Sequence, residues 1–149
     1  MLEKMCATMP ALEAVGVECV ALTLGEARLS APLDRNQNDK GTAFAGSLNG
    51  LGLLTGWLLT QRVAFEFSAE TQCAVFDART RFRQPVHGPL LARCKCSLTA
   101  RTDVLLALEQ AGRARWTLEI EVGSETLADA VRMTADYAIW TNKPGPHVP

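Results

Sequence analysis

The chain has 149 residues, of which 48% are hydrophobic and 21% charged, a balance that fits a single domain over residues 1–149 with a substantial core. Its formal net charge of -1 provides no long-range attraction to nucleic acid or to an anionic membrane, so neither is expected as a partner. Five cysteines without a CxxC pair argue against a disulfide framework and a zinc site, so we expect reduced thiols.

We expect no secretion signal, because no sustained apolar run near the N-terminus ends at a small-residue cleavage site. We therefore expect a cytoplasmic protein. Local patterns predict a helix over Leu2–Thr8 that Pro10 stops, followed by a helical turn over Leu12–Val15. Two strands follow, a bulged one over Val15–Leu24 and a second over Ala27–Ala31 that forms a hairpin with it.

A polar run from Asp34 to Gly41 predicts a loop, and a long apolar helix follows it. The helix is expected over Ala43–Val63 with Thr42 as its N-cap, and because it is apolar nearly all round, most of its surface must be covered. Its apolar stretch is shorter than the roughly 20 residues that a membrane span needs. It keeps four glycines, each costing roughly 1 kcal/mol relative to alanine, so a backbone, a partner subunit or a ligand should approach closely at Gly46, Gly50, Gly52 and Gly56.

Four strands and one short helix are predicted after the long helix. Alternating residues place the strands at about 73–83, 90–99, 114–122 and 131–139, with Asp103 capping the helix before the third strand and Gly112 closing it. In the first strand one face is expected to hold Ala74, Phe76, Ala78, Thr80 and Phe82, opposite a charged face. That strand should pair with the next one across the turn at 85–89, and the tail from Asn142 should be frayed.

This order predicts an α+β fold in which one antiparallel sheet curls around one helix, since no βαβ alternation and no repeat occurs. Such a sheet has unpaired edge strands. A two-fold dimer that joins edges is the economical way to cover them.

The segment at the start of the helix resembles the signature of a known family. Asn38-Asp39-Lys40-Gly41-Thr42-Ala43-Phe44-Ala45-Gly46-Ser47-Leu48 is similar to N-D-K-G-T-A-F-G-G-S-L, found in hotdog-fold thioesterases that occur in bacteria alone or fused behind an acetyltransferase domain. Ala45 replaces the first helical glycine. The resemblance extends from Ala31 through Trp140, and it implies a hotdog fold, a coenzyme A or acyl-carrier thioester as substrate, no cofactor or metal, and a homodimer or dimer of dimers.

The same segment resembles the N-x-x-G-x-x-H-G-G pattern of phenylacetyl-CoA-type hotdog thioesterases, with matches at Asn38, Gly41 and Gly46. Two positions depart from it. Phe44 stands in place of the histidine, which also speaks against a hotdog dehydratase, and Leu53 stands in place of the helical aspartate expected to activate water. Either another carboxylate serves in hydrolysis, or the chain binds thioesters without hydrolysing them.

Thioester hydrolysis requires a polarised carbonyl, an oriented water with a base, and a dry slot for the acyl chain. Backbone N–H groups at Ala45 and Gly46 are candidates for holding the carbonyl oxygen, because the first turn of a helix leaves them unpaired. Asp39 is the candidate base, and Asn38 is expected to orient the water or the carbonyl. The alternative for both is the ordinary role of Asp and Asn in turns.

Other candidates are polar side chains in the helix and cations near it. Ser47 and Asn49 need polar partners inside an apolar helix, and a ligand or the helix backbone could provide them. Arg83 and His87 are candidates for phosphate contacts, although a solvated surface also explains them. The expected catalytic residues are Asn38, Asp39 and Ser47, and the expected substrate-binding residues are Phe44, Ala45, Gly46, Asn49, Arg83 and His87.

A thioesterase is therefore the leading hypothesis, with a non-hydrolytic acyl-thioester binding module as the alternative. Ser47 is not expected to act as an acylated nucleophile, because no nucleophile elbow surrounds it. A purely structural dimerisation domain would leave the polar loop and the two polar helix residues unexplained.

Overall fold

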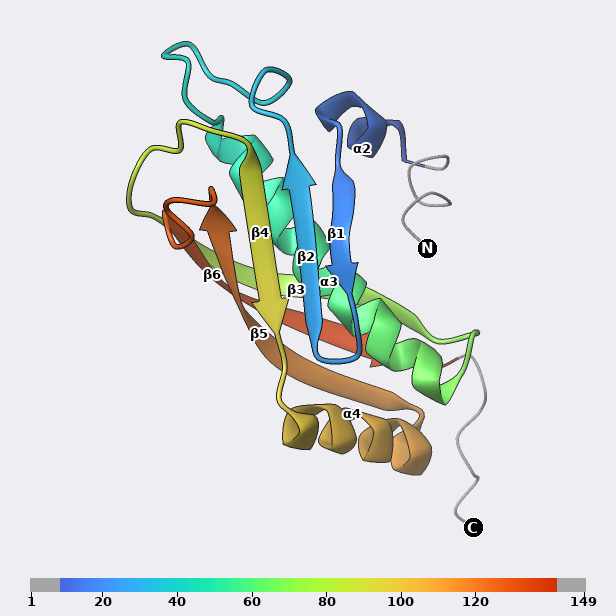
Figure 1. The fold of residues 1–149 in the computed structure, drawn as a ribbon. Helices are drawn as coiled ribbons and strands as arrows, with labels where there is room; N and C mark the ends of the chain where they lie inside the picture. Colours follow the sequence, from blue (N-terminus) through green and yellow to red (C-terminus); the bar gives the residue numbers. More distant parts are fainter. Residues whose placement is uncertain (1–8, 142–149) are drawn as a thin grey trace.

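A computed structural model describes residues 9–141 as a six-stranded antiparallel sheet that curves around one long helix (Figure 1). The sheet order is β1-β2-β4-β5-β6-β3. The predicted α+β architecture is confirmed. The elements are α2 (Pro10–Val15), β1 (Glu18–Leu22), β2 (Glu26–Ala31), α3 (Ala45–Phe67), β3 (Gln72–Phe82), β4 (Leu90–Lys95), α4 (Leu98–Ala111), β5 (Arg113–Gly123) and β6 (Val131–Trp140).

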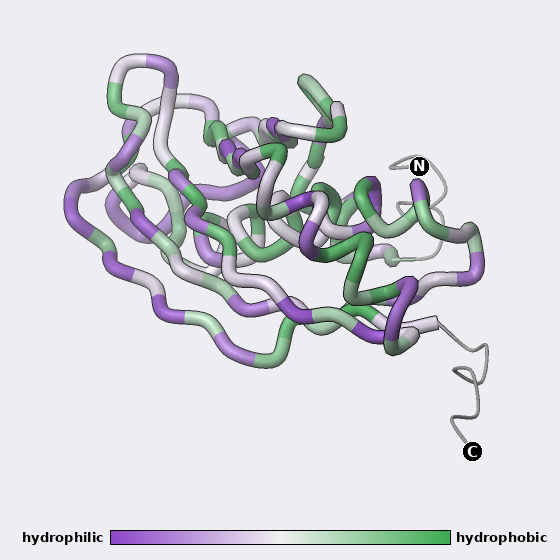
Figure 2. The backbone as a smooth tube through the Cα atoms, turned by 90° about the horizontal axis from the view of Figure 1, so that it is seen from below, coloured by the Kyte–Doolittle hydropathy of each residue, from purple (hydrophilic) through white to green (hydrophobic). Residues whose placement is uncertain are grey.

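Strand alternation decides which side chains face α3. Figure 2 shows purple and green residues alternating along the strands, as expected for a sheet with one buried face. In β5 the predicted inner residues are all buried, namely Ala114, Trp116, Leu118, Ile120 and Val122. The predicted bulge of β1 is also present, between Cys19 and Ala21.

The sheet approaches α3 most closely at two of its glycines. A Cβ atom at Gly52 would lie 2.9 Å from Cε of Met133, and one at Gly56 would lie 2.3 Å from Oη of Tyr137. Tyr137 is fully buried, and its hydroxyl donates to the carbonyl of Leu53 at 2.9 Å. Close approach of another group was predicted at these glycines, and in the structure the approaching groups are side chains of the sheet.

Polar groups on α3 are paired with the strands that cover it. The indole N–H of Trp116 donates to Oγ1 of Thr60 at 3.0 Å, and that of Trp57 donates to the carbonyl of Cys73 at 3.0 Å. Because a buried polar group without a partner costs about 1–3 kcal/mol, these bonds fix the rotation of the helix relative to the sheet.

The long helix differs from its prediction at both ends. It begins at Ala45 and ends at Phe67, and Phe44 is its N-cap residue. Thr42 does not cap it, because its hydroxyl accepts from Nδ2 of Asn38. The next residue, Ala43, forms a β-bridge with Gln37, and its N–H donates to the carbonyl of Val86.

The prediction for β3 was wrong in phase and in pairing. A bulge at Phe76 leaves that residue outside the ladder and reverses the alternation before it, so Cys73 and Val75 lie opposite the inward residues Ile139 and Tyr137. Beyond the bulge the predicted phase holds. The partner of β3 is β6, whereas β4 lies between β2 and β5, so the segment at 83–89 is a crossover and not a hairpin.

The two shorter helices also begin elsewhere than predicted. Helix α2 starts at Pro10, which occupies its first turn and does not stop it. Helix α4 starts at Leu98, because Ser97 accepts from the N–H of Ala100 at 3.1 Å and ends the preceding strand early. Gly112 closes α4 with φ 65°, as predicted. The predicted helix over 2–8 and the tail from residue 142 lie outside the described residues.

Within residues 9–141, no helix is long and apolar enough to cross a membrane, and no cluster of three or more His, Cys, Asp or Glu side chains could hold a metal ion. The described cysteines are free thiols. Cys94 is packed in the core, and burial raises the pKa of its thiol to about 12.

Candidate functional site

Asn38 organises the loop that leads into α3. Its Oδ1 accepts from the backbone N–H groups of Lys40 at 2.9 Å and Thr42 at 3.2 Å, while its Nδ2 donates to Oγ1 of Thr42 at 2.8 Å. Gly41 completes the turn with φ 74°, a backbone conformation that favours glycine. The amide of Asn38 is thus engaged by the loop, and its expected contact with substrate or water stays a prediction.

Asp39 lies at the exposed tip of this loop. Its carboxylate pairs with Nζ of Lys40 at 2.9 Å, and 78% of its side chain is exposed. An exposed pair between neighbouring residues is held weakly, so the carboxylate can move.

The first turn of α3 presents unpaired backbone N–H groups. Among residues 9–141 no side chain caps this end of the helix, and the first N–H paired within the helix belongs to Leu48, which donates to the carbonyl of Phe44 at 3.0 Å. The N–H groups of Ala45, Gly46 and Ser47 therefore have no partner in the helix ladder. They form the positive end of the helix dipole, where developing negative charge is stabilised.

Two cavities lie on either side of this first turn. One, of about 350 Å³, has a mixed lining, and we call it the polar cavity because Asn38, Thr42, Arg83 and Gln84 border it; its other lining residues are Ala43, Ala45, Leu48, Phe82 and Pro85. An apolar cavity of about 380 Å³ lies between α2 and the first half of α3. Figure 1 shows α2, the start of α3 and the 83–89 crossover at the same end of the molecule. Ala45 thus borders the polar cavity, and the next residue, Gly46, borders the apolar cavity.

Phe44, Gly46 and Ser47 border the apolar cavity. The ring of Phe44 lies over Gly46, where an added Cβ would come within 2.3 Å of Cε1 of Phe44, and half of the Phe44 side chain is exposed. Asn49 lies elsewhere, because its Oδ1 accepts from Oγ1 of Thr80 at 2.6 Å and ties α3 to β3. The polar partner of Asn49 is thus a strand residue.

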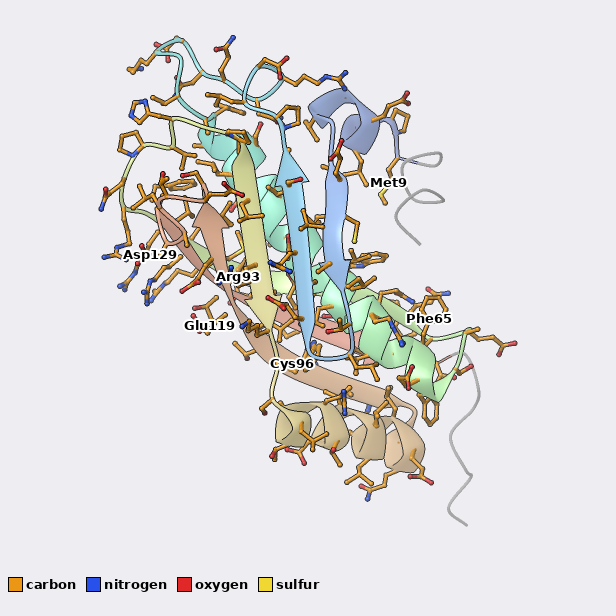
Figure 3. The ribbon with its side chains drawn as sticks, in the orientation of Figure 1. Met9, Phe65, Arg93, Cys96, Glu119 and Asp129 are labelled. Carbon is orange, nitrogen blue, oxygen red and sulfur yellow. The ribbon has the colours of Figure 1, made fainter. Side chains whose placement is uncertain are left out.

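Arg83 borders the polar cavity and pairs with Asp129. Hydrogen bonds from Arg132 and Arg83 hold the pKa of the Asp129 carboxyl below its usual range. Figure 3 shows Asp129 beside nitrogen-bearing side chains at the end of the sheet. A carboxylate held ionised by two guanidinium groups is a weak base, so Asp129 is a poor substitute for Asp39.

His87 borders a third cavity, of about 650 Å³, that also includes Arg28 and Ser30 of β2 and the segment 124–127. Pro85 borders both this cavity and the polar one. The structure therefore places His87 and Arg83 in different cavities, although they are close in sequence.

Residues 1–141 match the model of the family described as "Putative thioesterase (yiiD_Cterm)". The chain belongs to this thioesterase family. The match covers the loop, both cavities beside the first turn of α3 and all six strands.

Solved structures similar to this chain share its fold. One is a Chlorobaculum tepidum protein of unknown function, with 24% identity over 95% of this chain and 93% of that one, and a TM-score of 0.86. Another is a Pseudomonas aeruginosa protein described as a probable thioesterase, with 23% identity, 92% and 91% coverage and a TM-score of 0.80. A third is a Haemophilus influenzae thioesterase, with 17% identity, 98% and 92% coverage and a TM-score of 0.74. The hotdog fold is thereby confirmed.

Two parts of the site in this thioesterase-family chain were missed by the sequence analysis. Helix α2 forms a wall of the apolar cavity through Leu12 and Val15, whose spacing of three residues was the available signal. Asn36 is 2% exposed and also borders that cavity, but the polar run around it gave no sign that this residue alone is buried.

Proposed function

We propose that the protein hydrolyses the thioester of an acyl-CoA or an acyl-carrier protein at the junction between the 32–44 loop and α3. The observation that carries this proposal is the uncapped first turn of α3, open between a polar and an apolar cavity. Membership of a thioesterase family supports the reaction class.

In this reaction the thioester carbonyl oxygen accepts from the N–H groups of Ala45 and Gly46, which stabilise the negative charge of the tetrahedral intermediate. A water molecule attacks the carbonyl carbon and gives its proton to Asp39. The carbon–sulfur bond then breaks, and the thiolate leaves and takes up that proton as a thiol. Asn38 keeps the shape of the loop that carries Asp39.

Arg83 is suited to the phosphate of the carrier, because it borders the polar cavity and half of its side chain is exposed. We propose that the carrier reaches the junction from this side. His87, which borders the separate third cavity, is suited only to the distal part of the carrier.

The proposed assembly is a homodimer joined through β3. This strand has 11 residues and is the end member of the sheet, so one of its edges has no strand partner among residues 9–141. A long unpaired edge favours pairing with a second copy. We further propose a cytoplasmic location, supported by the free thiols of the described cysteines.

A non-hydrolytic acyl-thioester binding module is the second candidate, and the lack of a well-placed base favours it. Leu53 stands where the phenylacetyl-CoA-type thioesterases that the chain resembles carry a helical aspartate, and the carboxylate of Asp39 is exposed and paired with Lys40. The binder and the enzyme share the carbonyl site and differ in the base.

The test is to follow free thiol release by the purified protein from acyl-CoAs of varied chain length. The proposal expects turnover that Asp39→Ala lowers by about 10²–10⁴-fold in kcat, the usual contribution of general base catalysis. Lys40→Ala is the matched control, because it removes the ion pair and keeps the carboxylate. Tight binding without turnover, unchanged by Asp39→Ala, would favour the binding module.

A further inference from the structure

The apolar cavity beside α3 contains a glycine that packing does not explain. A Cβ atom at Gly52 or Gly56 would strike the sheet, and one at Gly46 would strike the ring of Phe44. At Gly50 an added Cβ would meet nothing within 4 Å. Glycine is less favourable than alanine inside a helix, so Gly50 costs stability without a close contact to justify it.

Gly50 borders the apolar cavity, and the residues around it are mostly hydrophobic. They come from three elements, because Leu12 and Val15 lie on α2, Ala31 ends β2, and Leu51 and Leu54 lie on α3. Gly50 is exposed, and a side chain at position 50 would extend into the open space at the border of this cavity. The cavity has a volume of about 380 Å³, at the lower end of the ~300–1,000 Å³ typical of small-molecule pockets.

A buried polar group beside the cavity also lacks a partner. Nδ2 of Asn36 donates to the carbonyls of Val15 at 2.8 Å and Pro32 at 2.7 Å, which fixes the amide and joins α2 to the loop. Its Oδ1 has no hydrogen-bond partner among the described residues, although Asn36 is only 2% exposed. An unpaired acceptor at the edge of an otherwise apolar cavity is a place where water or a ligand donor can be stabilised, whereas the rest of the lining suits hydrocarbon.

The two cavities suit different parts of one thioester. The polar side, with Asn38 and Arg83, suits water and the carrier, whereas the α2 side offers almost only apolar surface. Gly46 borders the apolar cavity, and the neighbouring Ala45 borders the polar one. A carbonyl held at these two N–H groups therefore has its acyl carbon chain next to the apolar opening.

We propose that the cavity between α2 and α3 binds the acyl chain and that Gly50 sets its depth. The inference rests on the proposed function, since it takes the occupant to be the acyl part of that thioester. The expected ligand class is an acyl group long enough to leave the first turn of α3 and enter the cavity. Affinity should rise with chain length until the cavity is full, because each added methylene leaves water.

The test measures equilibrium binding of S-octyl-CoA and S-ethyl-CoA, thioethers without a carbonyl to hydrolyse, to the full chain by calorimetry. Gly50→Leu should weaken S-octyl-CoA by ~10-fold or more and change S-ethyl-CoA by less than about twofold, with Gly50→Ala intermediate. Gln110→Leu adds the same side chain at an exposed position of α4 and should bind like the unsubstituted protein. Circular dichroism and light scattering establish that each variant is folded and in its original oligomeric state.

The outcomes separate this inference from the proposed hydrolysis. Selective loss of S-octyl-CoA binding in Gly50→Leu supports the acyl cavity even if the protein turns over no acyl-CoA. Absence of turnover would count against the proposed hydrolysis and not against the acyl cavity. Failure of the unsubstituted protein to bind S-octyl-CoA more tightly than S-ethyl-CoA, or unchanged S-octyl-CoA affinity in Gly50→Leu, would overturn it. A change of oligomeric mass in Gly50→Leu with unchanged S-octyl-CoA affinity would overturn it as well, and would make the cavity a contact between copies.

Discussion

Alanine at Gly50 and at Gly56 should change stability in opposite directions, although both positions lie in α3. At Gly50 a Cβ meets nothing within 4 Å, so Gly50→Ala gains the helix preference of about 0.5–1 kcal/mol. At Gly56 the same Cβ would lie 2.3 Å from Oη of Tyr137 and 2.9 Å from Cδ1 of Ile120. Since both neighbours are buried, relief requires movement in the core.

The expected loss at Gly56 combines two effects. Overpacking a core costs about 1–3 kcal/mol, and loss of the 2.9 Å hydrogen bond from Tyr137 to the carbonyl of Leu53 adds about 0.5–1.5 kcal/mol. After the helix preference is subtracted, Gly56→Ala should lose about 1–4 kcal/mol.

Urea denaturation followed by circular dichroism at pH 7 measures both free energies of unfolding. In thermal melts, each kcal/mol corresponds to about 2–4 °C in a chain of this size. Two variants that shift stability equally and in the same direction would refute the claim that the sheet packs against one glycine and leaves the other open.

Three further predictions concern packing, capping and pH. Thr60→Val should lower the free energy of unfolding by about 1–3 kcal/mol, because it leaves the buried indole N–H of Trp116 unpaired; an unchanged urea midpoint would contradict this bond. Ser97→Ala should cost about 1 kcal/mol in the same assay and Asp103→Ala less, a ranking that would reverse if α4 began at Asp103. Because burial raises the pKa of Cys94 from 9.0 to about 12, the contribution of this thiol to stability is complete below pH 9 and is lost as pH rises toward 12. The free energy of unfolding should therefore fall from pH 9 to 10.5, and it should fall less steeply in Cys94→Ala. Equal slopes of this free energy against pH in the two proteins would count against this assignment.

The elements that the sequence predicted best are those whose burial is decided locally. In β5 every second residue faces α3 without interruption, so the period of two was sufficient. The 38–48 segment likewise placed Asn38, Ala45 and Gly46 at the start of α3, because neighbours in sequence remain neighbours at a loop-to-helix junction.

The parts that could not be predicted depend on contacts between distant segments. Pairing of β3 with β6 is decided by sheet closure around α3, and the bulge at Phe76 appears in no local pattern; Phe76 instead faces outward, with the guanidinium of Arg115 4.9 Å from its ring centre. The apolar cavity likewise depends on α2 reaching across to α3. Arg83 and His87 were grouped because they are close in sequence, but the path of the crossover that carries both brings them to different cavities.

The central claim is that the thioester carbonyl binds at the uncapped first turn of α3. A crystal structure of the protein with an acyl-CoA analogue that keeps the carbonyl and replaces the sulfur with a methylene group tests it most directly. The account predicts the carbonyl oxygen at about 2.7–3.1 Å from the backbone nitrogen of Ala45 or Gly46, with the acyl chain directed toward α2. A carbonyl bound at another place, with these N–H groups facing only solvent, would contradict it.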